Sequence, residues 1–323
     1  MQKQIDTWQL IHQSLQQNIA VMLLYVLESK GSSPGRQGFM MAVNANGKMS
    51  GSLGGGIMEH KFIELAKSKL QQSSPEISLH QQVHDKAATK NQSGMICSGE
   101  QTIFLYTVKN EDAVAIGNII SSLKENKNGT LQLSSKGIFF STAVPGKNYE
   151  LQLKGDDDFL FTEKTGYKNI LCIIGAGHCA LALSQLMSAM DFYIYLFDDR
   201  HELNTMIENI FVHEKHLVVD YTALSAMVRP GNNSYVVVMT VGYRTDITAM
   251  KALLGKHFAY LGILGSKNKV KKMFEQLKAE AIDEIWLNTV HAPIGLPISS
   301  QSPEEIAVSI AAEIIKVKNA SVK

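Results

Sequence analysis

The segment Ile170–Arg200, which reads ILCIIGAGHCALALSQLMSAMDFYIYLFDDR, decides the fold of the second half of the chain. An apolar run rich in isoleucine, Ile170–Ile174, ends at the glycine turn Gly175–Gly177. Apolar residues then recur at three- and four-residue steps from Leu181 to Met190, which is the spacing of a helix with one buried face. A second apolar run follows this helix and ends at Asp198.

Strand, glycine turn, helix, strand and acid, in this order, predict a Rossmann-type dinucleotide-binding unit. Gly175 permits the tight turn, Gly177 lets the backbone approach a pyrophosphate, and Ala180 allows the helix to pack closely on its strand. The start of the helix offers unpaired N–H groups to the phosphates. We expect Asp198 to accept a hydrogen bond from a ribose hydroxyl. The alternative is a Rossmann scaffold that binds no nucleotide.

Length and composition indicate a globular protein of two domains, because 323 residues are many for one core. We place the domains at residues 1–166 and 167–323. A net charge of +1 gives no general attraction to nucleic acid or to an anionic membrane. The polar start of the chain is not typical of a signal peptide, and no apolar run is long enough to span a bilayer. Three cysteines without a CxxC pair favour the reducing cytoplasm.

The first half of the chain contains a second glycine-rich stretch, Gly51–Gly56, directly before a helix expected from Ile57 to about Leu70. Three consecutive glycines are conformationally costly, so this position needs bare backbone. One interpretation is a cradle of N–H groups for a phosphate or a similar oxyanion. The other is a tight turn with close packing. Glu59 lies in the first helical turn, where a carboxylate is favourable in any case.

The three cysteines have different expected environments. Cys97 lies between glycines before the strand Gln101–Val108, and it is either an exposed thiol suited to metal or sulfur chemistry or a small buried residue. Cys172 lies inside a buried strand. Cys179 lies in the first turn of the Rossmann helix, where the dipole can lower a pKa, but packing is the better explanation for this residue.

Two further apolar strands, Val236–Thr240 and Ala259–Leu264, are each followed by a helical pattern. This alternation predicts an α/β fold with a parallel sheet whose ligands bind at the carboxyl ends of the strands. Lys267 and Lys269 lie in the first turn of the last of these helices, where cations oppose the dipole. Either a bound phosphate or a solvated face explains them. The residues expected at these strand ends are Thr240, Asp246, Gly265 and Ser266.

The last helix of the chain has a well-marked start. Ser302 is the expected N-cap, Pro303 suits the first helical position, and Glu305 completes a capping box. An apolar stripe then predicts a helix that runs to about Ile315.

Six motifs occur in a fixed order between about residues 31 and 315. They are GSSPGRQG, GSLGGGIMEH, MICSGE, IIGAGHCA with LFDDR, AYLGILGSKNK, and HAPIGLPISSQSPEEIAVSIAAEI. Together they resemble the XdhC/CoxI family, the accessory proteins of xanthine dehydrogenase and related molybdenum hydroxylases. The resemblance covers most of the chain, and the ordered set is more specific than any single motif.

The resemblance implies an α/β fold, with an N-terminal XdhC/CoxI domain that includes a β-rich meander and a C-terminal Rossmann-like domain with a parallel sheet. Characterised members bind molybdenum cofactor (molybdopterin), help exchange an oxo ligand for a sulfido ligand, and deliver the cofactor to the apo-hydroxylase. The implied role is that of a maturation chaperone rather than a turnover enzyme. The implied partners are an apo molybdenum hydroxylase of the xanthine dehydrogenase type, a cysteine desulfurase, and a second copy of the chain.

The same resemblance assigns candidate site residues, with no catalytic residue and no metal site. The residues expected to bind molybdenum cofactor are Cys97, Ser33, Arg36, Gly54, Gly55, Gly56 and Glu59. The residues expected to bind a nucleotide, NAD(P), are Gly175, Gly177, His178, Asp198, Arg200, Thr240, Asp246, Gly265 and Ser266.

Two departures from the family pattern matter for function. Many members have Cys-Gly-Gly where this chain has Cys97-Ser98-Gly99, which adds bulk beside the thiol. Relatives commonly carry histidines where this chain has residues 241–245, and only Asp246 is retained. This second departure argues against catalysis in the Rossmann domain. An NAD(P)-dependent oxidoreductase, in which Asp198 favours NAD over NADP, and a nucleotide-sensing scaffold are the alternative functions.

Overall fold

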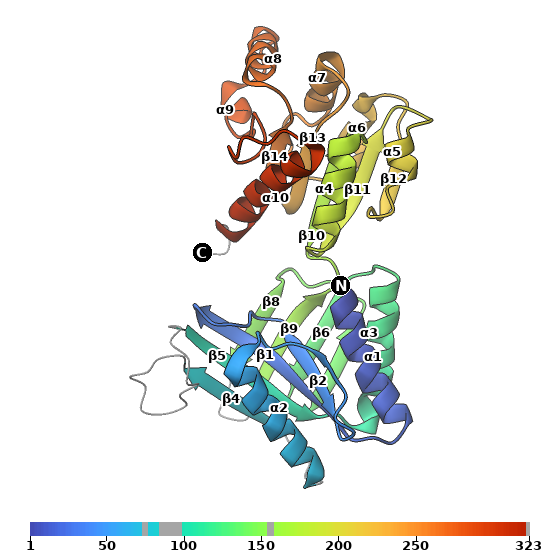
Figure 1. Ribbon diagram of the computed structural model, residues 1–323, viewed down its shortest axis with the longest axis vertical. Helices are drawn as coiled ribbons and strands as arrows, with labels where there is room; N and C mark the ends of the chain where they lie inside the picture. The colour runs from blue at the N-terminus through green and yellow to red at the C-terminus, as the bar shows by residue number, and fades with distance from the viewer. Residues whose placement is uncertain (73–76, 84–98, 154–157, 321–323) are drawn as a thin grey trace. The chain divides into compact units, whose positions relative to one another are not determined.

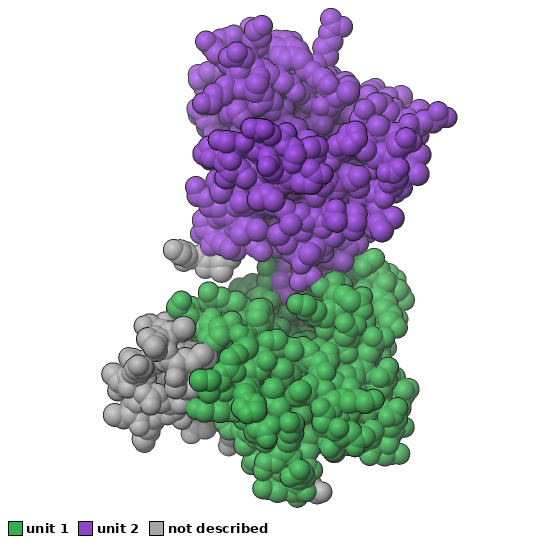
Figure 2. Space-filling model, in the orientation of Figure 1, with its two compact units in different colours: residues 1–166 green, residues 167–323 purple. Residues whose placement is uncertain are grey.

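The computed structural model describes residues 1–72, 77–83, 99–153 and 158–320. The chain divides into two compact units, Met1–Gly166 and Tyr167–Lys323, which Figure 2 shows in different colours. Unit 1 combines antiparallel sheets with helices, whereas unit 2 has one parallel sheet. The expected α/β fold with a parallel sheet in the second half is therefore confirmed.

The first sheet of unit 1 is five-stranded and antiparallel, in the order β3-β2-β1-β5-β4. Its strands are β1 (Val21–Gly31), β2 (Met40–Asn44), β3 (Met49–Gly51), β4 (Ile77–Val83) and β5 (Gly99–Thr107). The first seven residues of β1 are all buried. A strand that is apolar on both faces must be covered on both faces, and helices and a second sheet provide that cover.

The second sheet of unit 1 is four-stranded, antiparallel and ordered β7-β6-β9-β8. Its strands are β6 (Gly129–Ser134), β7 (Gly137–Ser141), β8 (Tyr149–Leu153) and β9 (Phe159–Thr165). Burial alternates along β9, so one face of this sheet packs inward. These strands form the meander that the sequence predicted in the first domain.

The helical elements in the described part of unit 1 lie beside these sheets (Figure 1). They are α1 (Gln2–Gln16), α2 (Gly56–Gln71), η1 (Asn110–Asp112) and α3 (Ala113–Lys124). Side chains of α2 such as Phe62 pack with Leu24 on one face of the first sheet. On the other face, Tyr25 shares a core with α1, α3 and Phe161 of the second sheet. The first sheet is thus the middle layer of unit 1.

The sheet of unit 2 is parallel, with the order β12-β11-β10-β13-β14. Its strands are β10 (Asn169–Ile174), β11 (Phe192–Asp198), β12 (Glu214–Leu217), β13 (Gly231–Val238) and β14 (Phe258–Ile263). Numbered along the chain this is 3-2-1-4-5, the order of the Rossmann fold. The order reverses beside β10, so the carboxyl end of β10 is the expected ligand position.

Helices cover both faces of this sheet, as a parallel sheet requires. Helix α10 packs with α4 on one face, where Ile310 and Leu183 share a core. Side chains of α7 and α8 such as Met250 and Met273 share a core on the other face. The helical elements are α4 (His178–Ser188), α5 (Asn204–Ile207), η2 (Tyr221–Ala223), α6 (Leu224–Met227), α7 (Tyr243–Ala252), α8 (Lys267–Ala279), α9 (Glu284–Leu287) and α10 (Pro303–Ala320).

Candidate functional site

The glycine-rich loop of unit 1 is a tight turn that holds a carboxylate of its own helix. Gly54, Gly55 and Gly56 have φ values of +120°, +81° and +73°. Three successive left-handed residues explain the glycine run, since other residues rarely adopt this conformation. The carboxylate of Glu59 accepts hydrogen bonds from the amides of Leu53 at 2.8 Å and Gly55 at 3.0 Å.

Glu59 is held in its charged form by this loop. Its Oε2 also accepts a hydrogen bond from the Ser52 hydroxyl at 2.6 Å. Burial acts to raise the pKa of Glu59, but the hydrogen bonds from Ser52, Leu53 and Gly55 outweigh it and hold that pKa below its ordinary value. The amides that were expected to meet a phosphate therefore already bind an anionic oxygen. A ligand phosphate must take the place of this side chain.

The loop containing Ser33 and Arg36 packs directly against the glycine-rich loop. A Cβ added to Gly35 would lie 1.9 Å from the Leu53 carbonyl oxygen, and one added to Gly54 would lie 2.3 Å from the Gly35 nitrogen. The side chain of Gln101 on β5 donates to the Gly35 carbonyl at 2.8 Å. Sequence reasoning missed Gln101, although its place at the start of a buried strand was a usable signal.

The side chains of Ser33 and Arg36 are engaged within their own loop. Ser33 is buried, and its hydroxyl donates to the Gly35 carbonyl at 3.1 Å. Arg36 is exposed and donates from Nη1 to the Gly31 carbonyl at 3.0 Å. The other guanidinium donors of Arg36 have no hydrogen-bond partner among the described residues, so they are available to an incoming anion. Cys97 lies outside the described residues, which resume at Gly99.

Gly175 and Gly177, in the turn after β10, differ in what surrounds them. Gly175 has a φ of +102°, and a Cβ there would lie 2.3 Å from the Met239 carbonyl oxygen. A Cβ on Gly177 would meet no atom within 4 Å. Gly175 thus fits this turn against the end of β13, while Gly177 leaves open space at the start of α4. His178 is the first residue of α4 and is exposed.

Asp198 ends β11 and is fully buried. Its Oδ2 accepts hydrogen bonds from the Ala176 amide at 2.7 Å and from Arg200 Nη2 at 2.8 Å. Its Oδ1 accepts from the amide of Arg200 at 3.0 Å and from Arg200 Nε at 2.8 Å. Burial opposes ionisation, but these donors hold the pKa of Asp198 below its usual range. The carboxylate ties the glycine turn to Arg200.

Thr240, Asp246, Gly265 and Ser266 lie together where β13 and β14 end. Asp246 is fully buried and accepts from the Thr240 hydroxyl at 2.6 Å and from the Thr240 amide at 3.1 Å. It also forms an ion pair with Lys269 of α8. The Lys269 side chain lies over Gly265, since a Cβ there would be 2.9 Å from Lys269 Cδ. The hydroxyl of Ser266 caps α8 by accepting from the Lys269 amide.

These contacts answer two questions that the sequence left open. Lys269 is neutralised by Asp246, so neither a bound phosphate nor a solvated face is needed to explain this cation.

The thiol of Cys179 has a raised pKa because it is partly buried and lies near Glu304. The net shift of the Cys179 pKa is therefore upward, which fits packing, the explanation that the sequence favoured. Burial likewise raises the pKa of Cys172 to about 12, which fits a core residue.

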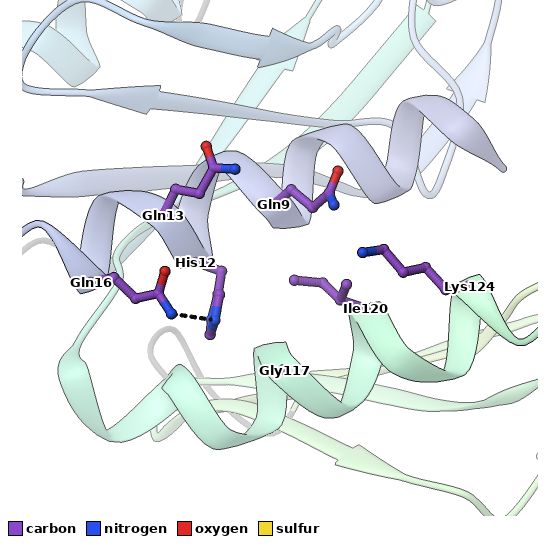
Figure 3. Close-up of a pocket in the computed structure, with 7 residues that line it drawn as sticks. All are labelled: Gln9, His12, Gln13, Gln16, Gly117, Ile120 and Lys124. Carbon is purple, nitrogen blue, oxygen red and sulfur yellow. Dashed lines mark hydrogen bonds between the residues drawn. The ribbon is translucent and has the colours of Figure 1, made fainter.

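A hollow of about 290 Å³ lies between α1 and α3 (Figure 3). No motif predicted it, and it includes none of the expected cofactor residues. Nε2 of His12 hydrogen-bonds the Gln16 amide at 3.1 Å, and Lys124 lies on the facing helix. The lining residues are Gln9, His12, Gln13, Gln16, Gly117, Ile120 and Lys124.

Within the described ranges, no group of three or more His, Cys, Asp or Glu side chains is arranged to hold a metal ion. None of the helices in those ranges combines the length and the apolar character that a bilayer span requires.

Two family models match the chain in separate segments. The XdhC and CoxI family matches residues 14–81, and the XdhC Rossmann domain matches residues 171–314. The chain belongs to the XdhC/CoxI family. The second segment contains the glycine turn, Asp198 and the Asp246 cluster, so the resemblance seen in the motifs and the geometry of unit 2 agree.

Two known proteins are similar in sequence to this chain. The uncharacterized protein YqeB of Escherichia coli is 26% identical over 94% of this chain and 44% of its own length. A Bacillus subtilis protein, named as a probable xanthine dehydrogenase component, is 27% identical over 49% of this chain and 46% of its own length. The chain spans less than half the length of either protein.

A solved structure from Bacillus halodurans, described as a xanthine dehydrogenase, has the same fold. It is 23% identical and has a TM-score of 0.69, and the alignment covers 97% of this chain and 96% of that one. At this level of identity the likeness concerns the fold and not the chemistry of the sites.

Proposed function

We propose that this protein is an accessory factor that binds molybdenum cofactor and supports its sulfuration and its insertion into a molybdenum hydroxylase of the xanthine dehydrogenase type. Membership of the XdhC/CoxI family and the names of the relatives support a role in xanthine dehydrogenase maturation. The observation that carries the proposal is the glycine-rich loop, whose amides already bind an anionic oxygen of Glu59.

The phosphate tail of the pterin is the part of the cofactor that suits this loop. Two amides and the Ser52 hydroxyl converge on one carboxylate oxygen, and a phosphate oxygen has the same charge and similar hydrogen-bonding needs. Exposed Arg36 lies on the neighbouring loop and would add a charge-assisted contact. Cys97 would contribute a thiolate to the molybdenum end. The partners would be the apo-hydroxylase and a cysteine desulfurase, with the chain acting as a homodimer.

Anaerobic purification of the protein from cells that make molybdenum cofactor tests this function. We expect the wild-type protein to carry molybdenum and pterin in equal amounts, and Cys97→Ala to lose most of both. Cys179→Ala is the matched control, because that thiol lies in unit 2. Folded wild-type protein without either ligand would contradict cofactor binding, and Cys97→Ala with full cofactor would remove the role of the thiol.

A second candidate function is nucleotide binding by unit 2, either as a sensor that gates cofactor delivery or as part of an NAD(P)-dependent oxidoreductase. The open space at Gly177, at the carboxyl edge of a Rossmann sheet, favours it. The sensor is the better supported role. Hydride transfer usually needs an acid–base group near the substrate, and the charged groups Asp246 and Lys269 at this edge are paired with each other. Titration with nicotinamide dinucleotides and an assay for hydride transfer separate the two roles.

A further inference from the structure

We propose that Arg200, and not Asp198, recognises the nucleotide at the end of β11, and that unit 2 therefore takes a dinucleotide with a 2′-phosphate, of the NADP class, in preference to NAD. This inference rests on the second proposed function, nucleotide binding by unit 2. It replaces the expectation that Asp198 binds the ribose and repels a 2′-phosphate.

Asp198 has no acceptor site left for a ribose hydroxyl. A carboxylate offers about four lone-pair sites, and Asp198 uses four, for the amides of Ala176 and Arg200 and for Nε and Nη2 of Arg200. The side chain is also 0% exposed. A ribose that approached it would have to break one of these bonds in a site closed to water, which is costly.

The group at this position that faces outward is the guanidinium of Arg200. Its side chain is 36% exposed, and two of its five N–H donors bind Asp198. The other three donors, both on Nη1 and one on Nη2, have no partner among the described residues. Because Asp198 fixes one edge of the planar group, these donors point in a direction set before any ligand arrives.

The shape of the guanidinium favours an anion with several oxygens over a hydroxyl. The guanidinium fork matches a phosphate with two parallel hydrogen bonds, whereas a 2′-hydroxyl can accept only weakly and would find no acceptor for its own hydrogen on Asp198. The adjacent carboxylate of Asp199 also interacts electrostatically with Arg200 and opposes an anion there, while its Oδ1 accepts from the Tyr221 hydroxyl at 3.2 Å. The turn that would hold the pyrophosphate is fixed as well, because the Thr205 hydroxyl donates to the Ala176 carbonyl at 2.5 Å.

Calorimetric titration of the full chain with NADP⁺ and with NAD⁺ tests the proposal. Adenosine 2′,5′-bisphosphate and 5′-AMP form a second pair that differs only in the 2′-phosphate. We expect each phosphorylated ligand to bind about tenfold or more tightly than its partner at low salt, and less so as salt screens the contact. Arg200→Gln should abolish the difference within each pair of ligands.

Two further variants complete the test, and the first of them is needed if Arg200→Gln leaves Asp198 unpaired and fails to fold. Arg200→Lys keeps a cation beside Asp198 but loses the fork, so it should retain the fold and lose most of the preference. Arg229→Gln, an exposed arginine before β13, is the matched control and should keep the full preference.

The outcomes separate this inference from nucleotide binding itself. Equal or tighter binding of NAD⁺ by the wild-type chain, or an unchanged preference in both Arg200 variants, would overturn the role of Arg200 and leave nucleotide binding standing. If folded wild-type protein binds none of the four ligands, nucleotide binding by unit 2 is itself refuted, and the inference goes with it.

Discussion

Two carboxylates in this protein bind the backbone of a glycine turn in their own unit. Glu59 accepts from the amides of Leu53 and Gly55, and Asp198 accepts from the amide of Ala176. Each turn is therefore ordered without a ligand, and each carries a negative charge where an anion was expected. A phosphate would exchange with Glu59 in unit 1, whereas in unit 2 it would meet the outer face of Arg200.

Glu59 should stabilise unit 1 in a pH-dependent way. We expect Glu59→Ala to lower the free energy of unfolding by about 1 kcal/mol at pH 7, since it removes charge-assisted hydrogen bonds at a half-buried site. The folded-state pKa of Glu59 is below its ordinary value, so this stabilisation is present above the unfolded pKa of about 4.3 and is lost as pH falls through the folded pKa.

Urea unfolding of wild type and Glu59→Ala at pH 7 and near pH 3 measures the Glu59 contribution. Glu64→Ala is the matched control on the same helix, where the loss of an exposed pair with Lys67 should leave the free energy of unfolding close to that of wild type. A difference between wild type and Glu59→Ala that stays the same at both pH values would show that the carboxylate charge is not the cause.

An alanine substitution should destabilise unit 2 at Gly175 but not at Gly177. Gly175→Ala combines a φ of +102° with an overlap on the Met239 carbonyl, and we expect it to lower the free energy of unfolding of unit 2 by about 2 kcal/mol or more. Gly177→Ala, with open space around it, should stay within about 0.5 kcal/mol of wild type but weaken nucleotide binding. Equal stability of the two variants would contradict the different roles given to Gly175 and Gly177.

At the scale of elements, α10 begins where its sequence predicts. Glu305 and Ser302 form a reciprocal capping pair: the Glu305 amide donates to the Ser302 hydroxyl at 3.2 Å, and the Glu305 carboxylate accepts from the Ser302 amide at 3.2 Å. The helix continues beyond its predicted end near Ile315 to Ala320. Helix ends set by local side chains are predictable, whereas those set by packing are less so.

The cap of α10 gives a prediction at this scale. Ser302→Ala should lower the free energy of unfolding of unit 2 by about 1 kcal/mol, because it leaves the Glu305 amide without its acceptor. Ser302→Thr keeps a hydroxyl and should recover most of the loss. Thermal unfolding followed by circular dichroism compares the variants, and an unchanged Ser302→Ala would mean that α10 is held by its packing on α4 alone.

The whole molecule consists of two units with separate cores. Among the described residues, each cluster of buried apolar side chains draws its members from one unit only. The two tryptophans are also divided, with Trp8 in unit 1 and Trp286 in unit 2. Each unit is therefore expected to fold by itself and to report on its own unfolding.

We expect residues 167–323, expressed alone, to fold and to unfold cooperatively, with the midpoint that Trp286 reports in the full chain. The full chain with Trp8→Phe supplies that reference, because Trp286 is then its single tryptophan. Urea unfolding followed by fluorescence makes the comparison. A fragment that unfolds without a cooperative transition would show that unit 2 depends on unit 1.

The sequence by itself determined the Rossmann unit with its parallel sheet, the glycine turn, the family and the cap of α10. These follow from short-range patterns: apolar periodicity, glycine at positive φ and the spacing of polar caps. Only the tertiary structure decided what the charged site residues bind. Asp198 pairs with Arg200, and Glu59 with the glycine loop, over a few residues of chain, because the turns after β11 and β3 fold each carboxylate back onto nearby donors. Asp246 pairs with Lys269 from a distant helix, because a buried charge must find a partner. The sequence lists these charged residues but not the backbone turns and the packing that decide which donors each carboxylate meets.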